Sequence, residues 1–382
     1  MKFAHLGDCH LGGWRQPELR ELNFKSFQQA VEKCINENVE FVIITGDLFD
    51  SAYPPIETLK GAFHEFRKLK ENLIPVFIIA GSHDYSASGK TFLDVLEKSG
   101  FCKNVAVFEE REGKIILEPT IHQNIAIYGY PGRKSGLEVE DISRIKIQDS
   151  PGLFKILMLH TAIRDALGNL PVEAVDEKTL PKCDYLALSH LHIDYARENR
   201  AYSGPTFPNS LPELAELKHG MFRIFENGKI RKEILKTKNV ETFDITISDA
   251  TNATNHILEV VKGKNLEDKI VILRLQGSLE RGKLSDIDFQ KIESYLKNQR
   301  VFVILKSTTK IHLAEPDFKI DLQDSVSLED QIIKNFEQNN YSKFNEFIPS
   351  LLQILQIEKA DEEKSLIFEE RLFSETRRIL KI

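Results

Sequence analysis

Five short apolar runs in the N-terminal half of the chain each end in a segment that carries histidine or aspartate. The runs lie at residues 3–6, 41–45, 76–80, 154–159 and 185–188. Uninterrupted apolar runs rich in β-branched residues are typical of strands that are buried on both faces of a sheet. Apolar residues at helical spacing separate the first three runs. The sequence therefore predicts a β-α-β-α-β start with parallel strands, and an α/β fold.

The segments that follow these runs hold the candidate chemistry. They are Gly7-Asp8-Cys9-His10, Gly46-Asp47-Leu48-Phe49-Asp50, Gly81-Ser82-His83-Asp84, His160 and His190-Leu191-His192. The functional crevice of an open α/β sheet lies at the carboxyl ends of its strands, so we expect these segments to converge. Residues i and i+2 of extended chain point the same way, which suits Asp8 and His10 to bind one ion. The same spacing applies to His190 and His192.

A metal site explains these segments better than isolated structural roles do. A single Gly-Asp or a single histidine at a strand end is more often a turn residue or a hydrogen-bonded core residue. Burying so many carboxylates and imidazoles together without a cation would cost several kcal/mol for each uncompensated charge. Mixed imidazole and carboxylate ligands suit Mn, Fe or Zn, and a shared carboxylate can hold two ions about 3.5–4 Å apart.

The rest of the chain divides into further predicted elements. Additional strands are predicted at residues 105–108 and 125–130. Near residue 237 the pattern resets, and a compact β-α-β-α-β module follows, with strands at 243–247, 270–275 and 301–305. From Ser327 the chain is predicted to be helical, with three apolar faces that begin near Leu328, Phe344 and Ile367. These helices either dock on their own chain, which spacing alone favours, or bind a groove or helix on a partner.

The ordered segments resemble the motifs of the calcineurin-like metallophosphoesterase superfamily. Within it, four segments resemble the SbcD or Mre-type nucleases of archaeal type: Asp8-Cys9-His10-Leu11-Gly12, Asp47-Leu48-Phe49-Asp50, Tyr128-Gly129-Tyr130-Pro131 and Tyr202-Ser203-Gly204-Pro205. Those proteins are nuclease subunits of a DNA double-strand-break-repair complex with a coiled-coil ATPase of the SMC-like type. The resemblance implies a β-sandwich flanked by helices over residues 1–235. It also implies a small α+β capping domain over 240–313 and a helical ATPase-partner-binding segment over 325–382.

The resemblance also implies a role for each site residue. The first metal would be bound by Asp8, His10 and His192, Asp47 would bridge, and the second metal would be bound by Ser82, His160 and His190. His83 would be the general acid or phosphate-orienting group, and Asp84 would support it by orienting its ring. The cofactors would be two divalent metal ions, with Mn²⁺ expected. The activity would be hydrolysis of DNA phosphodiester bonds as a 3'-5' exonuclease and endonuclease in double-strand-break repair and homologous recombination.

The implied partners are DNA, as double-strand ends and single strands, and the coiled-coil ATPase subunit. A homodimer is also implied, and the helices after Pro54-Pro55 are candidates for that surface only by analogy. Two positions depart from the family pattern, because Ser82 stands where the family has asparagine and Ser189 where it has glycine. A serine hydroxyl is a shorter and weaker ligand than an amide carbonyl, so we expect a loosely held second metal and attenuated activity.

Composition limits the remaining choices. With 41% hydrophobic and 29% charged residues, the chain is an ordinary globular protein. No apolar run approaches the roughly 20 residues needed to span a bilayer, and the first residues lack a signal-peptide pattern, so we expect a cytoplasmic, nucleoid-associated protein without membrane contact. The four cysteines form no CxxC pair, which predicts reduced thiols. The net charge of −7 predicts weak DNA binding with a shallow salt dependence, since no basic footprint is present.

Two alternatives to a repair nuclease remain open. One is a stand-alone metallophosphoesterase that acts on a small phosphate ester with the same metals. The other is a scaffold that binds DNA ends and the ATPase but cleaves poorly, which Ser82 motivates. The 147 residues after position 235 favour the nuclease subunit over the small-ester enzyme, because a small-molecule esterase has no evident need for a capping module and three amphipathic helices.

Overall fold

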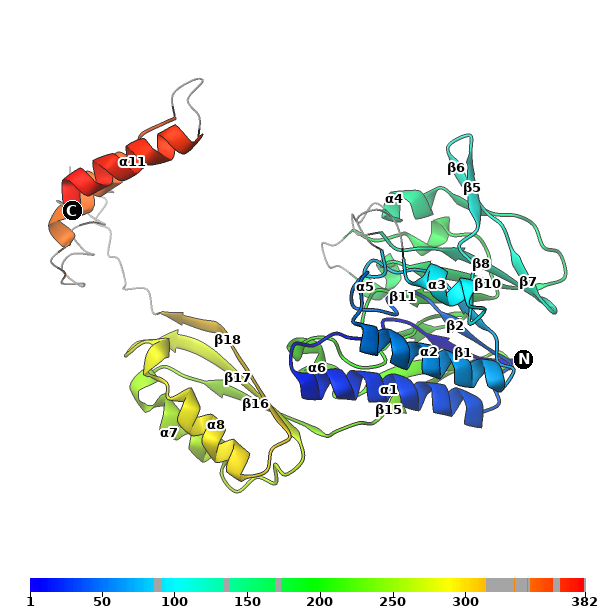
Figure 1. The fold of residues 1–382 in the computed structure, drawn as a ribbon, viewed down its shortest axis with the longest axis horizontal. Coiled ribbons are helices and arrows are strands. Elements are labelled where there is room, and N and C mark those ends of the chain that lie inside the picture. Colours follow the sequence, from blue (N-terminus) through cyan, green and yellow to red (C-terminus); the bar gives the residue numbers. More distant parts are fainter. Residues whose placement is uncertain are drawn as a thin grey trace. The chain divides into compact units, whose positions relative to one another are not determined.

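The computed structural model forms two compact units, Met1–His312 and Leu313–Ile382. It describes residues 1–85, 91–133, 138–168, 173–313, 333, 342, 344–359 and 365–380. The first unit holds both large sheets and the module after residue 237, and the second holds the C-terminal helices (Figure 1).

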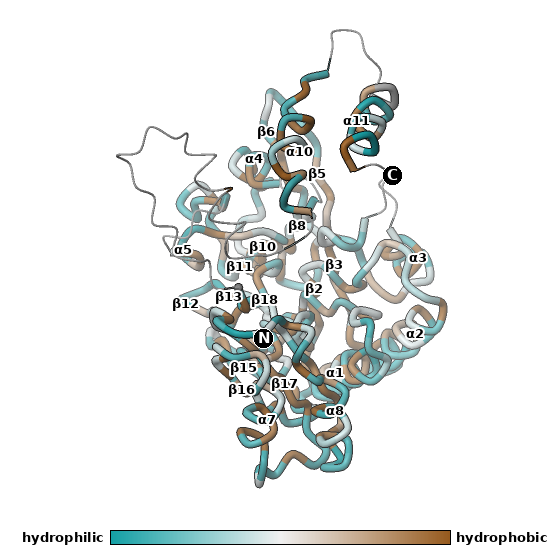
Figure 2. Tube along the Cα trace, turned by 90° about the vertical axis from the view of Figure 1, so that its left-hand side faces the viewer, coloured by the Kyte–Doolittle hydropathy of each residue, from teal (hydrophilic) through white to brown (hydrophobic). Residues whose placement is uncertain are grey.

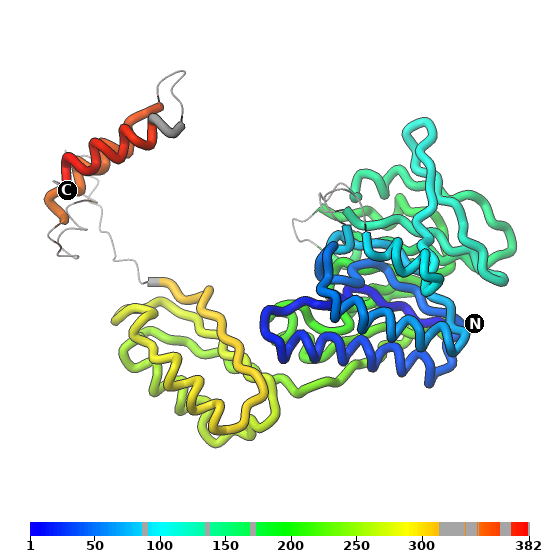
Figure 3. The backbone as a smooth tube through the Cα atoms, in the orientation of Figure 1, coloured from blue at the N-terminus to red at the C-terminus, as the bar shows by residue number. Residues whose placement is uncertain are grey.

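The first large sheet has six strands, of which four run parallel. Its order is β15 (Lys229–Leu235), β14 (Gly220–Glu226), β1 (Lys2–Leu6), β2 (Phe41–Ile44), β3 (Val76–Ile78) and β4 (Lys103–Asn104). Strands β1 to β4 pair in parallel, and β14 pairs antiparallel with both β1 and β15. Although more than 200 residues separate them, β1 and β14 therefore lie side by side, as Figure 3 shows in blue and green.

The second large sheet also has six strands, with a parallel centre. Its order is β12 (Ala196–Arg197), β13 (Arg200–Tyr202), β11 (Tyr185–Ser189), β10 (Phe154–His160), β8 (Ile125–Tyr130) and β7 (Thr120–His122). The two sheets pack face to face, since the ring centroid of Phe3 in β1 lies 5.2 Å from that of Tyr185 in β11, within one buried cluster. Each fully buried side chain of this size contributes about 1.5–3 kcal/mol.

Helices and a small sheet cover the outer faces of this sandwich. On the first sheet lie α1 (Pro17–Asn36), α2 (Ile56–Glu71) and α3 (Leu93–Lys98), whose apolar faces join one buried cluster with Ala4 and Leu6 of β1. Hydrophilic residues alternate with hydrophobic ones along α1 and α2, as expected for helices with one buried face (Figure 2). On the second sheet lie β5 (Phe108–Arg111), β6 (Lys114–Leu117), β9 (Ile145–Ile147) and α4 (Glu138–Ser143). The predicted β-sandwich flanked by helices is confirmed.

One predicted strand, at residues 105–108, is wrong. Val105 continues the edge pairing for one residue, because its backbone N–H donates to the Ile78 carbonyl at 3.0 Å. The N–H of Val107 then donates to the Val105 carbonyl at 2.9 Å, which closes a tight turn. Val107 and Phe108 are consequently each 40% exposed, and the next strand, β5, begins at Phe108.

The predicted module after residue 237 is a three-stranded sheet with two helices on one face. Strands β16 (Val240–Thr246), β17 (Ile270–Leu279) and β18 (Val303–Leu313) form the sheet, and β16 pairs in parallel with β17. Helices α7 (Ala250–Val261) and α8 (Phe289–Asn298) cover it (Figure 1). Its other face joins a buried cluster with residues of α1 and of α6 (Leu211–Leu217), which packs the module onto the sandwich. The predicted β-α-β-α-β order is confirmed.

The second unit contains two described helices, α10 (Ile348–Leu355) and α11 (Ser365–Leu380), which contact each other. The 3₁₀ turn Asn345–Phe347 leads into α10. Two further short 3₁₀ turns, Glu177–Thr179 and Leu284–Asp286, belong to the first unit. The helix predicted near Leu328 falls largely outside the described residues. Within the described ranges, no helix combines the length and the apolar character that a membrane crossing requires.

Candidate metal centre

The five predicted segments do converge at the carboxyl ends of their strands. Backbone hydrogen bonds connect the loops after β1 and β2. The N–H of Asp8 donates to the carbonyl of Gly46, and the N–H of His10 donates to the carbonyl of Asp47, each at 3.0 Å. Asp8, His10, Asp47 and His190 all have positive φ values, of 48°, 44°, 49° and 95°. Non-glycine residues rarely adopt this backbone, and such strain clusters at functional sites.

The first cluster comprises Asp8, His10 and His192, whose potential ligand atoms all lie within 4.8 Å of one another. The Nε2 atoms of the two histidines are 3.1 Å apart, and Nε2 of His192 is 3.8 Å from Oδ1 of Asp8. Two imidazole nitrogens at this spacing match neighbouring ligands of one cation, which lie about 3 Å apart when each is about 2.1 Å from the ion.

The second cluster comprises Asp8, Asp47 and His160, again within 4.8 Å. Nε2 of His160 lies 3.3 Å from Oδ2 of Asp47, and Nε2 of His10 lies 3.7 Å from the same oxygen. Asp47 is therefore placed between the histidines of both clusters. Ser82 is also close, since its hydroxyl donates to Asp47 Oδ2 at 3.4 Å.

His190 lies at the edge of the second cluster. Its ring centroid is 5.1 Å from that of His160. Its backbone N–H donates to both carboxylate oxygens of Asp8, at 3.0 and 3.1 Å, which fixes the Asp8 side chain toward the centre. All seven predicted ligand positions are thus brought to one place.

His83 is exposed at the rim of the centre. Its ring is oriented by a backbone carbonyl and not, as predicted, by Asp84. Nδ1 of His83 lies 2.9 Å from the carbonyl oxygen of Asp50. The Asp84 carboxylate instead accepts from three backbone N–H groups, those of Leu48, Phe49 and Gly81 at 3.3, 3.0 and 2.9 Å. Asp84 therefore ties the loops after β2 and β3 together, and it supports His83 through the backbone rather than through the ring.

Glycines leave the space in which these side chains meet. A Cβ at Gly81 would collide with the carboxylate and backbone of Asp47, and a Cβ at Gly46 would lie 2.6 Å from Nδ1 of His160. Gly46 also has a φ of +106°, which side-chain-bearing residues rarely adopt. The two glycines explain why both loops can approach the centre so closely.

The buried carboxylates of the centre stabilise positive charge on the groups around them. Burial opposes ionisation of Asp47, yet the neighbouring His160 and His10 lower the pKa of its carboxyl well below the usual range. Burial likewise disfavours a charged His160, but Asp47 raises the pKa of this imidazole to about 9. The pKa of His192 is raised to about 9 because Asp8 and Glu213 outweigh its burial. Protons thus take the positions that cations would occupy, and metal binding would displace them.

The donor set fits divalent cations. Nε2 of His160 is buried and has no hydrogen-bond partner among the described residues. Its Nδ1 lies 3.1 Å from the carbonyl oxygen of Thr45, which can only accept, so Nδ1 keeps its proton in either charge state of the ring. Once a cation displaces the second proton, Nε2 presents its lone pair. An unpartnered buried nitrogen beside a carboxylate is the arrangement of an imidazole ligand.

Three polar residues around the centre were not assigned a role from sequence. Asp50 lies 3.2 Å from Nδ1 of His10, and Glu213 accepts from Nδ1 of His192 at 2.8 Å. Asn209 contacts both carboxylates. The only sequence signal at Glu213 is a Ser-x-x-Glu pattern with Ser210, which indicates a helix start rather than a metal centre.

Two residues near the centre, Cys9 and His5, have potential metal-binding side chains but structural surroundings. Cys9 is fully buried, and burial raises the pKa of its thiol above the usual range. His5 is also fully buried, with Tyr185 and Thr45 hydroxyls 2.9 and 3.1 Å from its two nitrogens. Both residues therefore belong to the core.

Comparison with known proteins agrees with this geometry. The chain is 28% identical over 350 residues to the DNA double-strand break repair protein Mre11 of Methanocaldococcus jannaschii, covering 87% of this chain and 88% of the relative. It is 26% identical to the Mre11 protein of Sulfolobus acidocaldarius, covering 97% and 94%. For the Mre11 protein of Archaeoglobus fulgidus the identity is 25%, covering 76% and 72%.

The family model that matches this chain is the calcineurin-like phosphoesterase domain, over residues 1–194. That range contains all five strand-end segments and therefore every predicted ligand. The family uses a dinuclear metal site, and the two adjoining clusters contain candidate metal-binding residues. The chain is thus a member of the calcineurin-like phosphoesterase family.

Proposed function

We propose that this protein is a Mn²⁺-dependent DNA nuclease that acts as the nuclease subunit of a double-strand-break-repair complex with a coiled-coil ATPase. The observation that supports this most directly is the buried meeting of two metal-ligand clusters in a chain that aligns with Mre11 proteins over 87% and 97% of its length. The alignment extends well past the phosphoesterase domain, which a small-ester enzyme would not require.

The ligand assignment follows the two clusters. Asp8, His10 and His192 would hold the first metal, and Asp47 would bridge. Ser82, His160 and His190 would hold the second. Cations bound here would supply Lewis acidity, since they neutralise charge on a phosphodiester and acidify water at neutral pH.

His83 is suited to handle the leaving group. Its Nδ1 must carry a proton, because the Asp50 carbonyl 2.9 Å away can only accept. Its Nε2 is then available to orient a phosphate oxygen or, when the ring is protonated, to donate a proton to the departing oxygen. The exposed position of His83 places this proton at the mouth of the centre, where a DNA strand would arrive.

The deciding assay offers the purified protein with Mn²⁺ to double-stranded DNA, single-stranded DNA and the generic diester bis(p-nitrophenyl) phosphate. Asp47→Asn should reduce all cleavage to background, because it removes the bridging charge. The matched control is Asp244→Asn, which makes the same change in an exposed ion pair with Arg274 on the capping module. The control should retain wild-type activity.

Each contrary result selects an alternative. Cleavage of the generic diester but of neither DNA would favour a small-ester phosphoesterase. Binding of two metals without cleavage of any substrate would favour a DNA-end scaffold, for which Ser82 is the supporting observation. Undiminished activity of Asp47→Asn would refute the metal assignment as a whole.

We also propose that residues 1–235, 240–313 and 325–382 act as nuclease, capping and partner-binding segments. In the last of these, α10 and α11 contact each other and still expose Leu355 and Phe373, by 75% and 66%. Apolar side chains exposed on a helix pair suit a partner's coiled coil. Removal of residues 328–382 should abolish capture of the ATPase subunit while Mn²⁺ binding persists, and an unchanged pull-down would refute this role.

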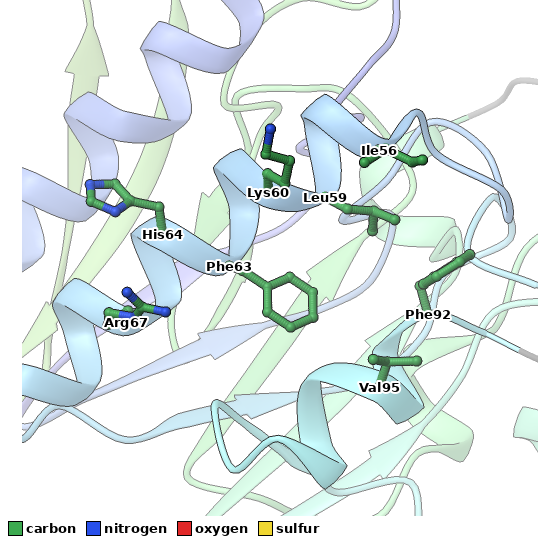
Figure 4. A pocket seen from close by; sticks show the side chains of 8 residues that line it. All are labelled: Ile56, Leu59, Lys60, Phe63, His64, Arg67, Phe92 and Val95. Carbon is green, nitrogen blue, oxygen red and sulfur yellow. The ribbon is translucent and has the colours of Figure 1, made fainter.

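A homodimer is proposed through α2 and α3. These helices line an apolar hollow of about 510 Å³ with residues that include Leu59, Phe63 and Val95 (Figure 4). Ile56 and Val95 on its rim are 73% and 45% exposed. Substitution Phe63→Glu should convert a dimer to a monomer in light scattering, and a wild-type protein that is monomeric at micromolar concentration would contradict the proposal.

A further inference from the structure

Both histidines of the first cluster are contacted from behind by carboxylates. Nδ1 of His192 donates to Oε2 of Glu213 at 2.8 Å, whereas Nδ1 of His10 lies 3.2 Å from Oδ1 of Asp50, an ion-pair distance without hydrogen-bond geometry. Because Nδ1 faces a carboxylate in each ring, each Nε2 is directed to the shared centre, where the two atoms are 3.1 Å apart. A carboxylate that accepts a hydrogen bond from Nδ1 fixes the tautomer and raises the basicity of a ligand imidazole, and the Asp50 carboxylate adds negative charge behind the His10 ring.

Asn209 joins the two carboxylates. Its side-chain Nδ2 donates to Oδ1 of Asp50 at 3.0 Å, and its backbone N–H donates to Oε2 of Glu213 at 2.9 Å. The hydroxyl of Ser210 donates to the other oxygen of Glu213 at 2.8 Å. The start of α6 therefore positions Glu213, while the Asn209 side chain reaches across 159 residues of sequence to position Asp50.

Gly13 leaves room for this bridge. A Cβ at Gly13 would lie 2.5 Å from Oδ1 of Asn209 and 3.3 Å from Oδ1 of Asp50. A contact of 2.5 Å is shorter than van der Waals packing permits, so a side chain here would displace the Asn209 amide. The loop after β1 is thus shaped around the connection between Asn209 and Asp50.

The histidine of the second cluster is held differently. Nδ1 of His160 lies 3.1 Å from the carbonyl oxygen of Thr45 and 2.9 Å from the hydroxyl of Ser189. Both groups are neutral. The first cluster therefore has two negatively charged groups behind its imidazoles, and the contacts recorded for His160 Nδ1 include none.

We propose that Asp50, Asn209 and Glu213 act as one positioning brace that holds His10 and His192 for the first metal and makes that metal the tighter of the two. The proposal rests on the proposed function, since it assumes that the two clusters bind divalent cations. None of the three residues is expected to touch the metal or the substrate, so they are positioning residues. Changes to such outer partners typically weaken metal affinity by about 10- to 100-fold.

The test measures Mn²⁺ binding to the full chain by isothermal titration calorimetry, with electron paramagnetic resonance to count bound ions. Glu213→Gln and Asp50→Asn should each weaken the tighter dissociation constant by about 10- to 100-fold. The weaker constant should stay within about twofold of wild type, because His160 does not contact the brace. Glu216→Gln is the matched control, since it makes the same charge change at an exposed position on the same helix.

Asn209 allows a sharper version of the test. Asn209→Ala removes the Nδ2 contact to Asp50 but keeps the backbone N–H that Glu213 accepts. It should therefore weaken the tighter constant in the wild-type background and add little to Asp50→Asn. Gly13→Ala should reproduce the effect of Asn209→Ala, because both disconnect the same amide from Asp50.

Three results would overturn the brace. The first is a tighter constant that Glu213→Gln leaves unchanged, and the second is an equal loss caused by Glu216→Gln. The third is a parallel loss at both metal positions together with a lower melting temperature of the metal-free protein, which would show a merely structural role. If the wild-type protein bound no Mn²⁺, the proposed function itself would fail, which is a distinguishable outcome.

Discussion

The sandwich and the module of β16 to β18 start from the same β-α-β-α-β order but differ in whether their acidic side chains are buried or exposed. In the sandwich, Asp8 and Asp47 at strand ends are buried, with positive φ and histidines nearby. In the module, Asp244 forms a two-pronged ion pair with Arg274 at 2.6 Å in solvent, and Asp249 caps α7 by accepting from the N–H of Thr251 at 2.9 Å. Parallel topology alone therefore does not create a site. A site requires buried charges whose local partners do not balance them.

The largest predicted effect tests whether the residues needed for DNA cleavage lie only in the sandwich. His83→Gln should slow DNA cleavage by about 10²- to 10⁴-fold, because it removes proton transfer or phosphate orientation. Both Mn²⁺ dissociation constants should stay unchanged, since His83 is not a proposed ligand. The control is His256→Gln on the exposed face of α7 in the module. A comparable loss of rate in the control would break the contrast between the two regions.

The next effect should be confined to the module. Ile292→Ala deletes a fully buried side chain of α8 and should lower the stability of the module by about 2–5 kcal/mol. Hydrogen exchange of β16 and β17 amides should accelerate, while Mn²⁺ binding and cleavage of the generic diester are retained. Ile234→Ala, at a 43% exposed position of β15, is the size-matched control. Loss of metal binding in Ile292→Ala would show that the two regions are not energetically separate.

The same contrast explains what sequence could predict. The convergence of the candidate ligands was predictable because each follows an uninterrupted apolar run, and the carboxyl ends of parallel strands meet at one edge. In the module, the strands were predictable from alternating polar and apolar residues, and the helices from apolar residues at helical spacing. The outer carboxylates were not, because Glu213 reaches His192 only through tertiary packing of α6, and its Ser-x-x-Glu pattern serves equally as a helix cap. The mistaken strand at residues 105–108 failed because a tight turn, which periodicity does not encode, exposes Val107.

A pH dependence should distinguish the core of the sandwich from the module. Burial, with the nearby charge of Arg223, lowers the pKa of His5 to about 3, whereas the unfolded value is about 6.5. The unfolded state alone binds this proton between the two values. His5 therefore reduces stability as the pH falls from about 6.5 to about 3, by up to about 1.4 kcal/mol per pH unit.

Urea unfolding in EDTA between pH 4 and pH 8 would measure this slope. His5→Gln should flatten the acid side of the curve, since the glutamine amide can still bond to Thr45 and Tyr185 without taking up a proton. His256→Gln in the module is the control and should keep the wild-type slope. An unchanged slope in His5→Gln would assign the acid sensitivity to other buried groups.

The smallest predicted effect concerns Ser82, where this chain departs from the family pattern. Its hydroxyl lies 3.4 Å from Oδ2 of Asp47, and a longer asparagine carbonyl would reach further into the second cluster. Ser82→Asn should therefore tighten the weaker Mn²⁺ constant by up to about tenfold, the lower end of the effect of a change beside a metal. Ser99→Asn, at an exposed position after α3, is the control.

Combining this change with Glu213→Gln asks whether the two metal positions are independent. One variant should strengthen the weaker position and the other should weaken the tighter one, through residues that share no contact. The two free-energy changes should then add within about 0.5 kcal/mol in the double variant. A larger deviation would mean that Asp47, which lies between both clusters, transmits each change to the other side. The difference between the two positions would then belong to the bridge rather than to their separate outer partners.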